Sequence, residues 1–240
     1  MCDNTYGTDG ILESEINGTI TVSQLEEYIL NYFDADKINQ KPETVSDLLR
    51  YYKDTTDYLY QYLRCVSDKE LIFASNELRA ALGHIAEYRI NNDGTKNDLE
   101  KAYGHFRRMT LDILKVICDV FDESLLRFFK KACKVDFRNV DNEFLKDYSQ
   151  SYFKAKQLYL SAQSDERTGA DSEKHNVIEK YLLAAKEYIK LKQYKDCHPE
   201  IQTTIRSSKL IKIIVIAVGI IGFIWNAYSV FNMLFCGLAN

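Results

Sequence analysis

The sequence has few residues that interrupt helices: among its 240 residues are only two prolines and ten glycines. It also has no stretch of useful length in which apolar and polar residues alternate, the pattern typical of a half-buried strand. These two absences exclude a turn-rich β protein and favour long helices. The 17 tyrosines and 12 phenylalanines supply ample apolar surface for a core. The sequence therefore predicts an all-α fold, an antiparallel helical bundle.

Short motifs of several common enzyme classes are also absent. There is no phosphate-binding Gly-Lys-Ser/Thr loop, no Gly-x-Gly-x-x-Gly turn, no Gly-x-Ser-x-Gly elbow, no His-Glu-x-x-His motif and no calcium loop. The six cysteines contain no Cys-x-x-Cys pair, which favours reduced thiols over a metal site or a disulfide framework. Nothing in the sequence points to a cofactor or a bound metal.

A large excess of charge of either sign is also absent, because 31 basic residues nearly balance 35 acidic ones. No global field therefore attracts the chain to nucleic acid. The first 17 residues have no basic segment followed by an apolar run, so we expect no signal peptide.

One long apolar run is present near the C-terminal end of the sequence, where Ile213–Phe235 contains no charged residue. A bilayer core needs about 20 apolar helical residues, so this run predicts a single C-terminal transmembrane helix. Arg206, Lys209 and Lys212 precede it and no charged residue follows, which places the body in the cytoplasm by the positive-inside rule. We expect a single-pass protein anchored in the inner membrane, with the lipid bilayer as a partner.

The chain divides into a flexible N-terminus (1–20), a helical body (21–199), a basic juxtamembrane linker (200–210) and the transmembrane helix (211–236). Capping boxes at Ser23–Glu26 and Ser67–Glu70 mark two helix starts in the body. Apolar periodicity predicts helices over 23–33, 45–66, 67–90, 98–121, 140–164 and 172–195. We expect a restart or bend of the helix at Asp122, directly after the 98–121 segment.

Two stretches of the body, 78–85 and 99–106, resemble one another, with His84 and His105 in matching places 21 residues apart. On antiparallel helices that turn near Asp93, these histidines lie about 14 and 18 Å from the turn, so they can face each other. Gly83 and Gly104 precede them, and we interpret both glycines as points where the two backbones approach closely.

The same register predicts that arginines converge on the histidine pair to form an electropositive pocket. The candidate catalytic residues are Arg79, His84, His105 and Arg108. Histidine would transfer protons and arginine would stabilise the charge that develops when a phosphodiester is cleaved by its own 2′-hydroxyl. In the alternative interpretation both histidines form ordinary hydrogen bonds inside the bundle, and the arginine stems lie on its surface.

The segment Arg79-Ala-Ala-Leu-Gly-His84 resembles the Arg-x4–6-His motif of the HEPN superfamily, although Ala80 departs from the Asn, Asp or His that often follows the arginine. The resemblance implies a helical bundle that dimerises at the motif, with metal-independent RNase activity in toxin, CRISPR or anti-phage systems. With its membrane tether, the chain is also similar to the membrane-anchored accessory proteins of type VI-B CRISPR systems. That similarity implies an oligomeric pore and an RNA or CRISPR effector partner.

Small and polar residues recur along one face of the expected span at spacings of three and four: Gly219, Gly222, Asn226, Ser229 and Met233. Such a face favours close helix association in lipid and predicts a homo-oligomer, with a simple anchor as the alternative. The leading hypothesis is an oligomeric effector of antiviral defence that perturbs the membrane, for example as a pore. The alternatives are a membrane-tethered RNase and a non-catalytic scaffold.

Overall fold

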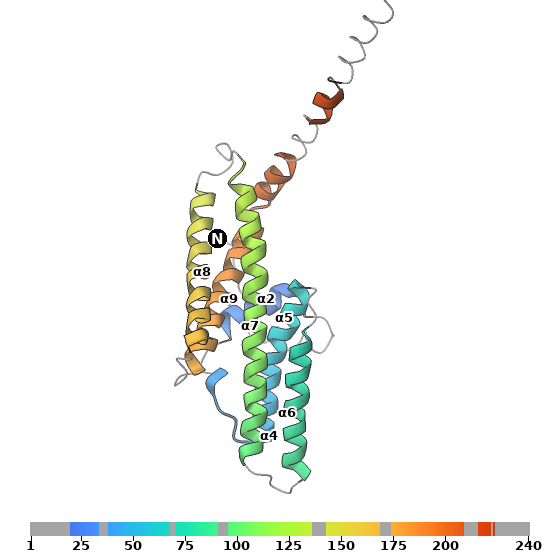
Figure 1. Cartoon of the computed structure of the whole chain (residues 1–240), viewed down its shortest axis with the longest axis vertical. Helices are drawn as coiled ribbons and strands as arrows, with labels where there is room; N and C mark the ends of the chain where they lie inside the picture. Colours follow the sequence, from blue (N-terminus) through green and yellow to red (C-terminus); the bar gives the residue numbers. More distant parts are fainter. Residues whose placement is uncertain are drawn as a thin grey trace, which may run out of the picture.

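A computed structural model describes residues 20–33, 38–67, 71–90, 96–135, 143–168, 174–208, 216–221 and 223. All regular secondary structure within these ranges is helical, which confirms the predicted all-α class (Figure 1). The elements are α2 (Val22–Asn31), α4 (Val45–Tyr51), the π-helix η1 (Tyr52–Asp57), α5 (Tyr58–Val66), α6 (Ile72–Ile90), α7 (Lys96–Ala132), α8 (Phe144–Thr168) and α9 (Lys174–Asp196).

Helix α7 is the central element of the bundle. It contains 37 residues and lies between α4, α5 and α6 on one side and α8 and α9 on the other (Figure 1). The predicted restart of the helix at Asp122 is wrong, because α7 continues unbroken to Ala132. The Asp122 carboxylate accepts hydrogen bonds from the Tyr152 and Tyr188 hydroxyls, at 2.8 and 2.9 Å, and therefore does not cap a new helix.

Two hydrophobic cores lie along α7. The larger core joins α2, α5, α8, α9 and Ala74 of α6 to α7 from Met109 onward. The smaller core joins α4 and α6 to the first turns of α7. The buried residues of the smaller core are Val45, Leu48, Tyr51, Ala81, Leu99, Ala102, Tyr103 and Phe106.

The start of α2 differs from the predicted one by two residues. Thr21 is the N-cap, and it forms a reciprocal capping box with Gln24. Glu26, expected to close the box, is instead buried and accepts hydrogen bonds from Tyr62 Oη at 3.1 Å and Lys192 Nζ at 2.6 Å. Glu26 thus ties α2 to α5 and α9. Residues 1–19 and 68–70, which include most of the second predicted box, lie outside the described ranges.

The helix predicted over 45–66 is present but changes its winding in the middle. The π-helix η1 separates α4 from α5. A π-helix loosens the normal hydrogen-bond ladder, and contacts from other helices meet it here. The Tyr28 hydroxyl donates to the Asp54 carbonyl at 2.9 Å, and the buried hydroxyls of Thr56 and Thr110 lie 2.9 Å apart.

The segment that was expected to link the body to the membrane is helical over 199–208. Ile201 and Ile205 are buried in the larger core, and the His198 ring lies 5.0 Å from the ring of Phe144. This part of the predicted linker therefore packs as part of the body.

Within the described ranges, no helix has both the length and the apolarity to cross a bilayer. Most of the predicted span, including Gly222, Asn226, Ser229 and Met233, lies outside those ranges. Residues 216–221 and 223 are helical. Their large apolar side chains are between 56 % and 76 % exposed: Ile216, Val218, Ile220, Ile221 and Phe223.

Candidate functional site

The two histidines predicted to face each other do so across the seam between α6 and α7. The rings of His84 and His105 stack with their centroids 5.3 Å apart and their planes 23° from parallel. Alanine makes this seam narrow, since Ala74, Ala81 and Ala102 are completely buried. The register inferred from the resemblance of the two stretches is thus confirmed.

The glycines beside the histidines do not have the role that we predicted for them. A Cβ atom added to Gly83 would meet nothing within 4 Å. A Cβ atom at Gly104 would meet Arg108 Nη1 at 3.7 Å, an ordinary van der Waals contact. The prediction that both glycines permit close backbone approach is therefore wrong.

His105 is held by a carboxylate that the sequence analysis missed. Its Nδ1 lies 2.7 Å from Glu77 Oε2 and 2.7 Å from Arg108 Nη2, while Arg108 Nε donates to Glu77 Oε2 at 3.1 Å. A carboxylate accepts and a guanidinium donates, so the two contacts of Nδ1 require different tautomers of His105. Glu77 is thus the common partner of His105 and Arg108.

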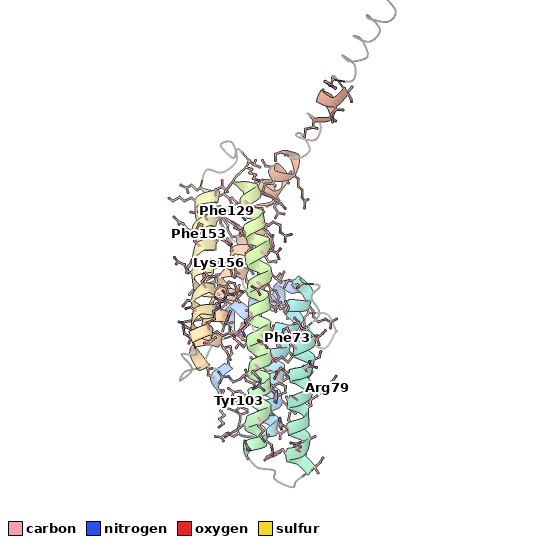
Figure 2. All side chains as sticks on the ribbon, in the orientation of Figure 1. Phe73, Arg79, Tyr103, Phe129, Phe153 and Lys156 are labelled. Carbon is pink, nitrogen blue, oxygen red and sulfur yellow. The ribbon has the colours of Figure 1, made fainter. Side chains whose placement is uncertain are left out.

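Of the four candidate catalytic residues, Arg79 alone does not join this cluster. It is exposed and lies on the outer side of α6 (Figure 2). It precedes His84 by five residues, which places it about 140° around the helix from that histidine. The neighbouring Arg107 on α7 also points elsewhere, because its guanidinium lies 5.7 Å from the centre of the Tyr103 ring.

Carboxylates, not arginines, surround the other histidine. A ring nitrogen of His84 and carboxylate oxygens of Glu87 and Asp98 all lie within 4.8 Å of one another. The described charged groups at the seam are three carboxylates, Glu77, Glu87 and Asp98, and two cations, Arg108 and Lys101. These charges do not support the predicted electropositive pocket, because the carboxylates outnumber the cations by one. Glu87 follows His84 by three residues, a helical spacing that the sequence already contained.

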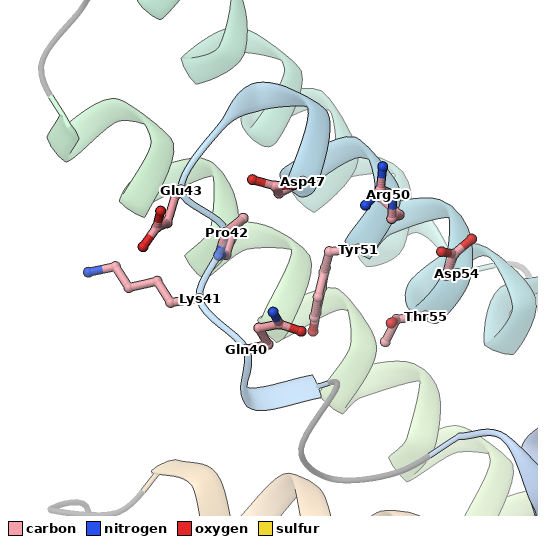
Figure 3. A pocket seen from close by; sticks show the side chains of 9 residues that line it. All are labelled: Gln40, Lys41, Pro42, Glu43, Asp47, Arg50, Tyr51, Asp54 and Thr55. Atoms are coloured by element: carbon pink, nitrogen blue, oxygen red, sulfur yellow. The ribbon is translucent and has the colours of Figure 1, made fainter.

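A separate pocket of about 540 Å³ lies beside α4 and η1, and it shares no residue with the histidine cluster (Figure 3). Burial raises the pKa of the Tyr51 hydroxyl, which lines the pocket, well above its usual range. Acidic and basic residues both line the pocket, so its walls do not select a ligand of one charge. The lining residues are Gln40, Lys41, Pro42, Glu43, Asp47, Arg50, Tyr51, Asp54 and Thr55.

Comparisons with known proteins do not place this chain in a family, since no family model, curated protein or solved structure matches it. The HEPN resemblance, carried by Arg79 and His84, therefore stays a prediction. Function has to be argued from the chemistry of the described residues and from the sequence of the predicted span.

Proposed function

We propose that this chain is a single-span membrane protein whose helical body lies at the cytoplasmic face and which self-associates through its span. In this proposal the oligomer perturbs the membrane, as a pore or by another route, in bacterial antiviral defence. Bilayer lipid and further copies of the chain are its main partners. An RNA or a CRISPR effector is the further partner that the family resemblance implies.

The observation that carries the proposal is the exposed apolar surface of residues 216–221 and 223. Ile216, Ile221 and Phe223 are 62 %, 65 % and 76 % exposed. Transferring such surface from water to lipid is favourable by about 25 cal/mol per Å². These residues belong to the uncharged run Ile213–Phe235, which is long enough to cross the hydrocarbon core of a bilayer. Insertion into a bilayer accounts for both features.

Membrane fractionation of the full chain tests the anchor. We expect the protein to resist extraction by alkaline carbonate and to need detergent, while a chain truncated after Ser208 stays soluble and helical. Ser208 is a suitable end because the described body, including Ile201 and Ile205, is retained. Release of the full chain by carbonate would contradict the proposal.

Association through the small and polar face has its own test. We expect Asn226→Leu with Ser229→Leu to reduce cross-linked oligomers and membrane depolarisation without loss of insertion, because interhelical hydrogen bonds of about 0.6 to 2 kcal/mol are removed. The matched control changes the opposite side of the helix, with Ile220→Leu and Ile224→Leu, which lie about 140° and 180° from the centre of that face. Equal depolarisation by both double variants would overturn a pore lined by that face.

Metal-independent RNA cleavage is a second candidate, favoured by one contact: the Arg108 guanidinium lies 2.7 Å from the His105 ring. The surrounding carboxylates oppose it, because Glu77 already pairs with Arg108 and repels a phosphodiester. We expect the detergent-purified full chain not to cleave RNA. Cleavage that His84→Ala and His105→Ala abolish would establish the RNase instead. If neither depolarisation nor cleavage is observed, a non-catalytic scaffold is the remaining interpretation.

A further inference from the structure

We infer that His84, Glu87 and Asp98 form a binding site for a divalent transition-metal ion at the α6–α7 seam. His84 and Glu87 lie in the last two turns of α6, and Asp98 lies in the first turn of α7. The ligands therefore come from both arms of the helical hairpin. A bound ion would join the two helices near the end of α6 and the start of α7.

The spacing of the donor atoms fits a metal better than it fits direct bonding between the side chains. His84 Nδ1 and Glu87 Oε2 lie 3.4 Å apart, and Nδ1 has no hydrogen-bond partner although the atom is buried. Two donors that each lie about 2.0 to 2.1 Å from a tetrahedral Zn²⁺ are about 3.3 Å apart. The ion would thus occupy the position between them without a change in their separation.

Asp98 completes the set at a short distance. One of its oxygens lies within 4.8 Å of the other two donor atoms, which a side-chain rotation can close. Its side chain is only 14 % exposed, and Lys101 Nζ lies 3.8 Å from its Oδ1. A carboxylate with so little exposure is stabilised by a nearby positive ion.

The charge of the three ligands favours a cation over an anion, even with Lys101 Nζ 3.8 Å from Asp98. Glu87 and Asp98 contribute two negative charges, which a divalent ion neutralises while His84 stays uncharged as a ligand. One imidazole and two carboxylates suit a borderline ion such as Zn²⁺, Co²⁺ or Mn²⁺, and Zn²⁺ binds more tightly than Mn²⁺ in such sites. Three protein ligands leave a fourth position for water.

The neighbouring cluster supports the ligand geometry. The His105 ring stacks on His84 at 5.3 Å and is itself fixed by Glu77 at 2.7 Å. Packing against this held ring limits the orientations that are open to the His84 ring. In this interpretation the His105–Glu77–Arg108 contacts position His84 and do not act on a substrate. The inference is independent of membrane insertion, because it uses residues of the body alone.

The test is metal titration of the full chain in detergent after removal of metal by a chelator. We expect one equivalent of Zn²⁺ to compete with a chromophoric chelator, with a Kd in the micromolar range or tighter. His84→Ala, Asp98→Asn and Glu87→Gln should each weaken binding at least about tenfold. Glu87 is 62 % exposed, so its substitution leaves the fold intact. His198→Ala, which changes a histidine outside the seam, should bind as the unchanged chain does.

The absorption spectrum of bound Co²⁺ distinguishes binding at this site from binding at cysteine thiols. Co²⁺ at His84, Glu87 and Asp98 should give weak visible bands without the strong near-ultraviolet absorption of a cobalt thiolate. Exposed Cys65 and Cys133 would give the thiolate band if they bound the ion. A thiolate spectrum, binding only at millimolar Zn²⁺, or ligand variants that bind within tenfold of the unchanged chain would each overturn the inference.

Discussion

Asp122 shows how a single carboxylate organises the larger core. Its Oδ1 accepts from the hydroxyls of Tyr152 and Tyr188, and its Oδ2 accepts from Lys156 Nζ at 2.6 Å. These partners belong to α8 and α9, so one residue of α7 joins three helices. Burial, followed by the hydrogen bond to Asp122, raises the pKa of the Tyr152 hydroxyl, which keeps it protonated as a donor.

Removal of this carboxylate should be costly. We expect Asp122→Ala to lower the free energy of unfolding by roughly 2 to 4 kcal/mol, because it leaves two hydroxyls and an ammonium group without their acceptor. Tyr152→Phe removes one donor and should cost only about 1 kcal/mol. Denaturant unfolding of the chain truncated after Ser208 measures both values. Equal losses for the two variants would contradict the role of Asp122 as a common acceptor.

Glu166 gives the fold a predicted dependence on acid pH. Burial alone would raise the pKa of its carboxyl, but hydrogen bonds from Lys115 and Tyr181 outweigh burial and lower the pKa below its ordinary value of 4.5. A carboxyl with a lowered pKa in the folded state stabilises that state above its unfolded pKa, and this stability is lost as pH falls.

We therefore expect the free energy of unfolding to decrease as pH falls below about 4.5, less steeply in Glu166→Gln than in the unchanged chain. The slope should also decrease in high salt, because the Glu166 side chain is 38 % exposed. Urea unfolding at a series of pH values measures it. Glu123→Gln, on the exposed surface of α7, is the control and should keep the original slope.

At the scale of elements, α6 is the most lightly buried long helix beside α7. Only Ala74 and Ala81 of α6 are buried, whereas Ile72 and Leu82 are 69 % and 49 % exposed. The periodicity of one helix does not fix its rotation against a neighbour, and here the buried alanines fix it.

Gly83 offers a direct test of this packing. We expect Gly83→Ala to raise the free energy of unfolding by about 0.5 to 1 kcal/mol, because alanine has the higher helix propensity. The space is available, since an added Cβ meets nothing within 4 Å. Gly104→Ala is the comparison, with a contact at 3.7 Å to Arg108. Thermal unfolding measures both, and a loss of stability at Gly83 would show that another surface packs there.

The α6–α7 hairpin also shows what the sequence could and could not predict about the site. The histidine register followed from helical rise and from the resemblance of the two stretches. The partners did not, because the Glu77–His105 contact joins residues 28 positions apart and depends on how the two helices rotate. The position of Arg79 could have been predicted, since five helical residues separate it from His84 by more than a third of a turn.

At the scale of the whole molecule, the all-α class and most helix positions followed from periodicity and the scarcity of helix-breaking residues. The segment 200–210 was predicted as a linker, because Pro199 marks the predicted end of the body. Only long-range packing reveals that Ile201 and Ile205 are buried. The π-helix η1 likewise depends on contacts from α2 and α7, which no local pattern encodes.

The helix over 199–208 should therefore contribute to the stability of the entire body. We expect Ile201→Ala to lower the free energy of unfolding by about 2 to 4 kcal/mol, the usual cost of a cavity in a packed core. Thr203→Ala, two residues away and exposed, should change it by less than about 0.5 kcal/mol. Chemical denaturation measures both. Equal effects would mean that this segment does not pack as described.

The continuity of α7 has a consequence for motion. His105 and Ala132 are separated by about 40 Å of one helix, with the smaller core around the former and the larger core around the latter. A small core opens more often than a large one, so amide hydrogens of α6 should exchange with deuterium sooner than those of α9. We therefore expect local opening to be more frequent at the histidine end of the molecule. A metal ion bound there would slow hydrogen exchange in α6 and leave the exchange of α9 unchanged.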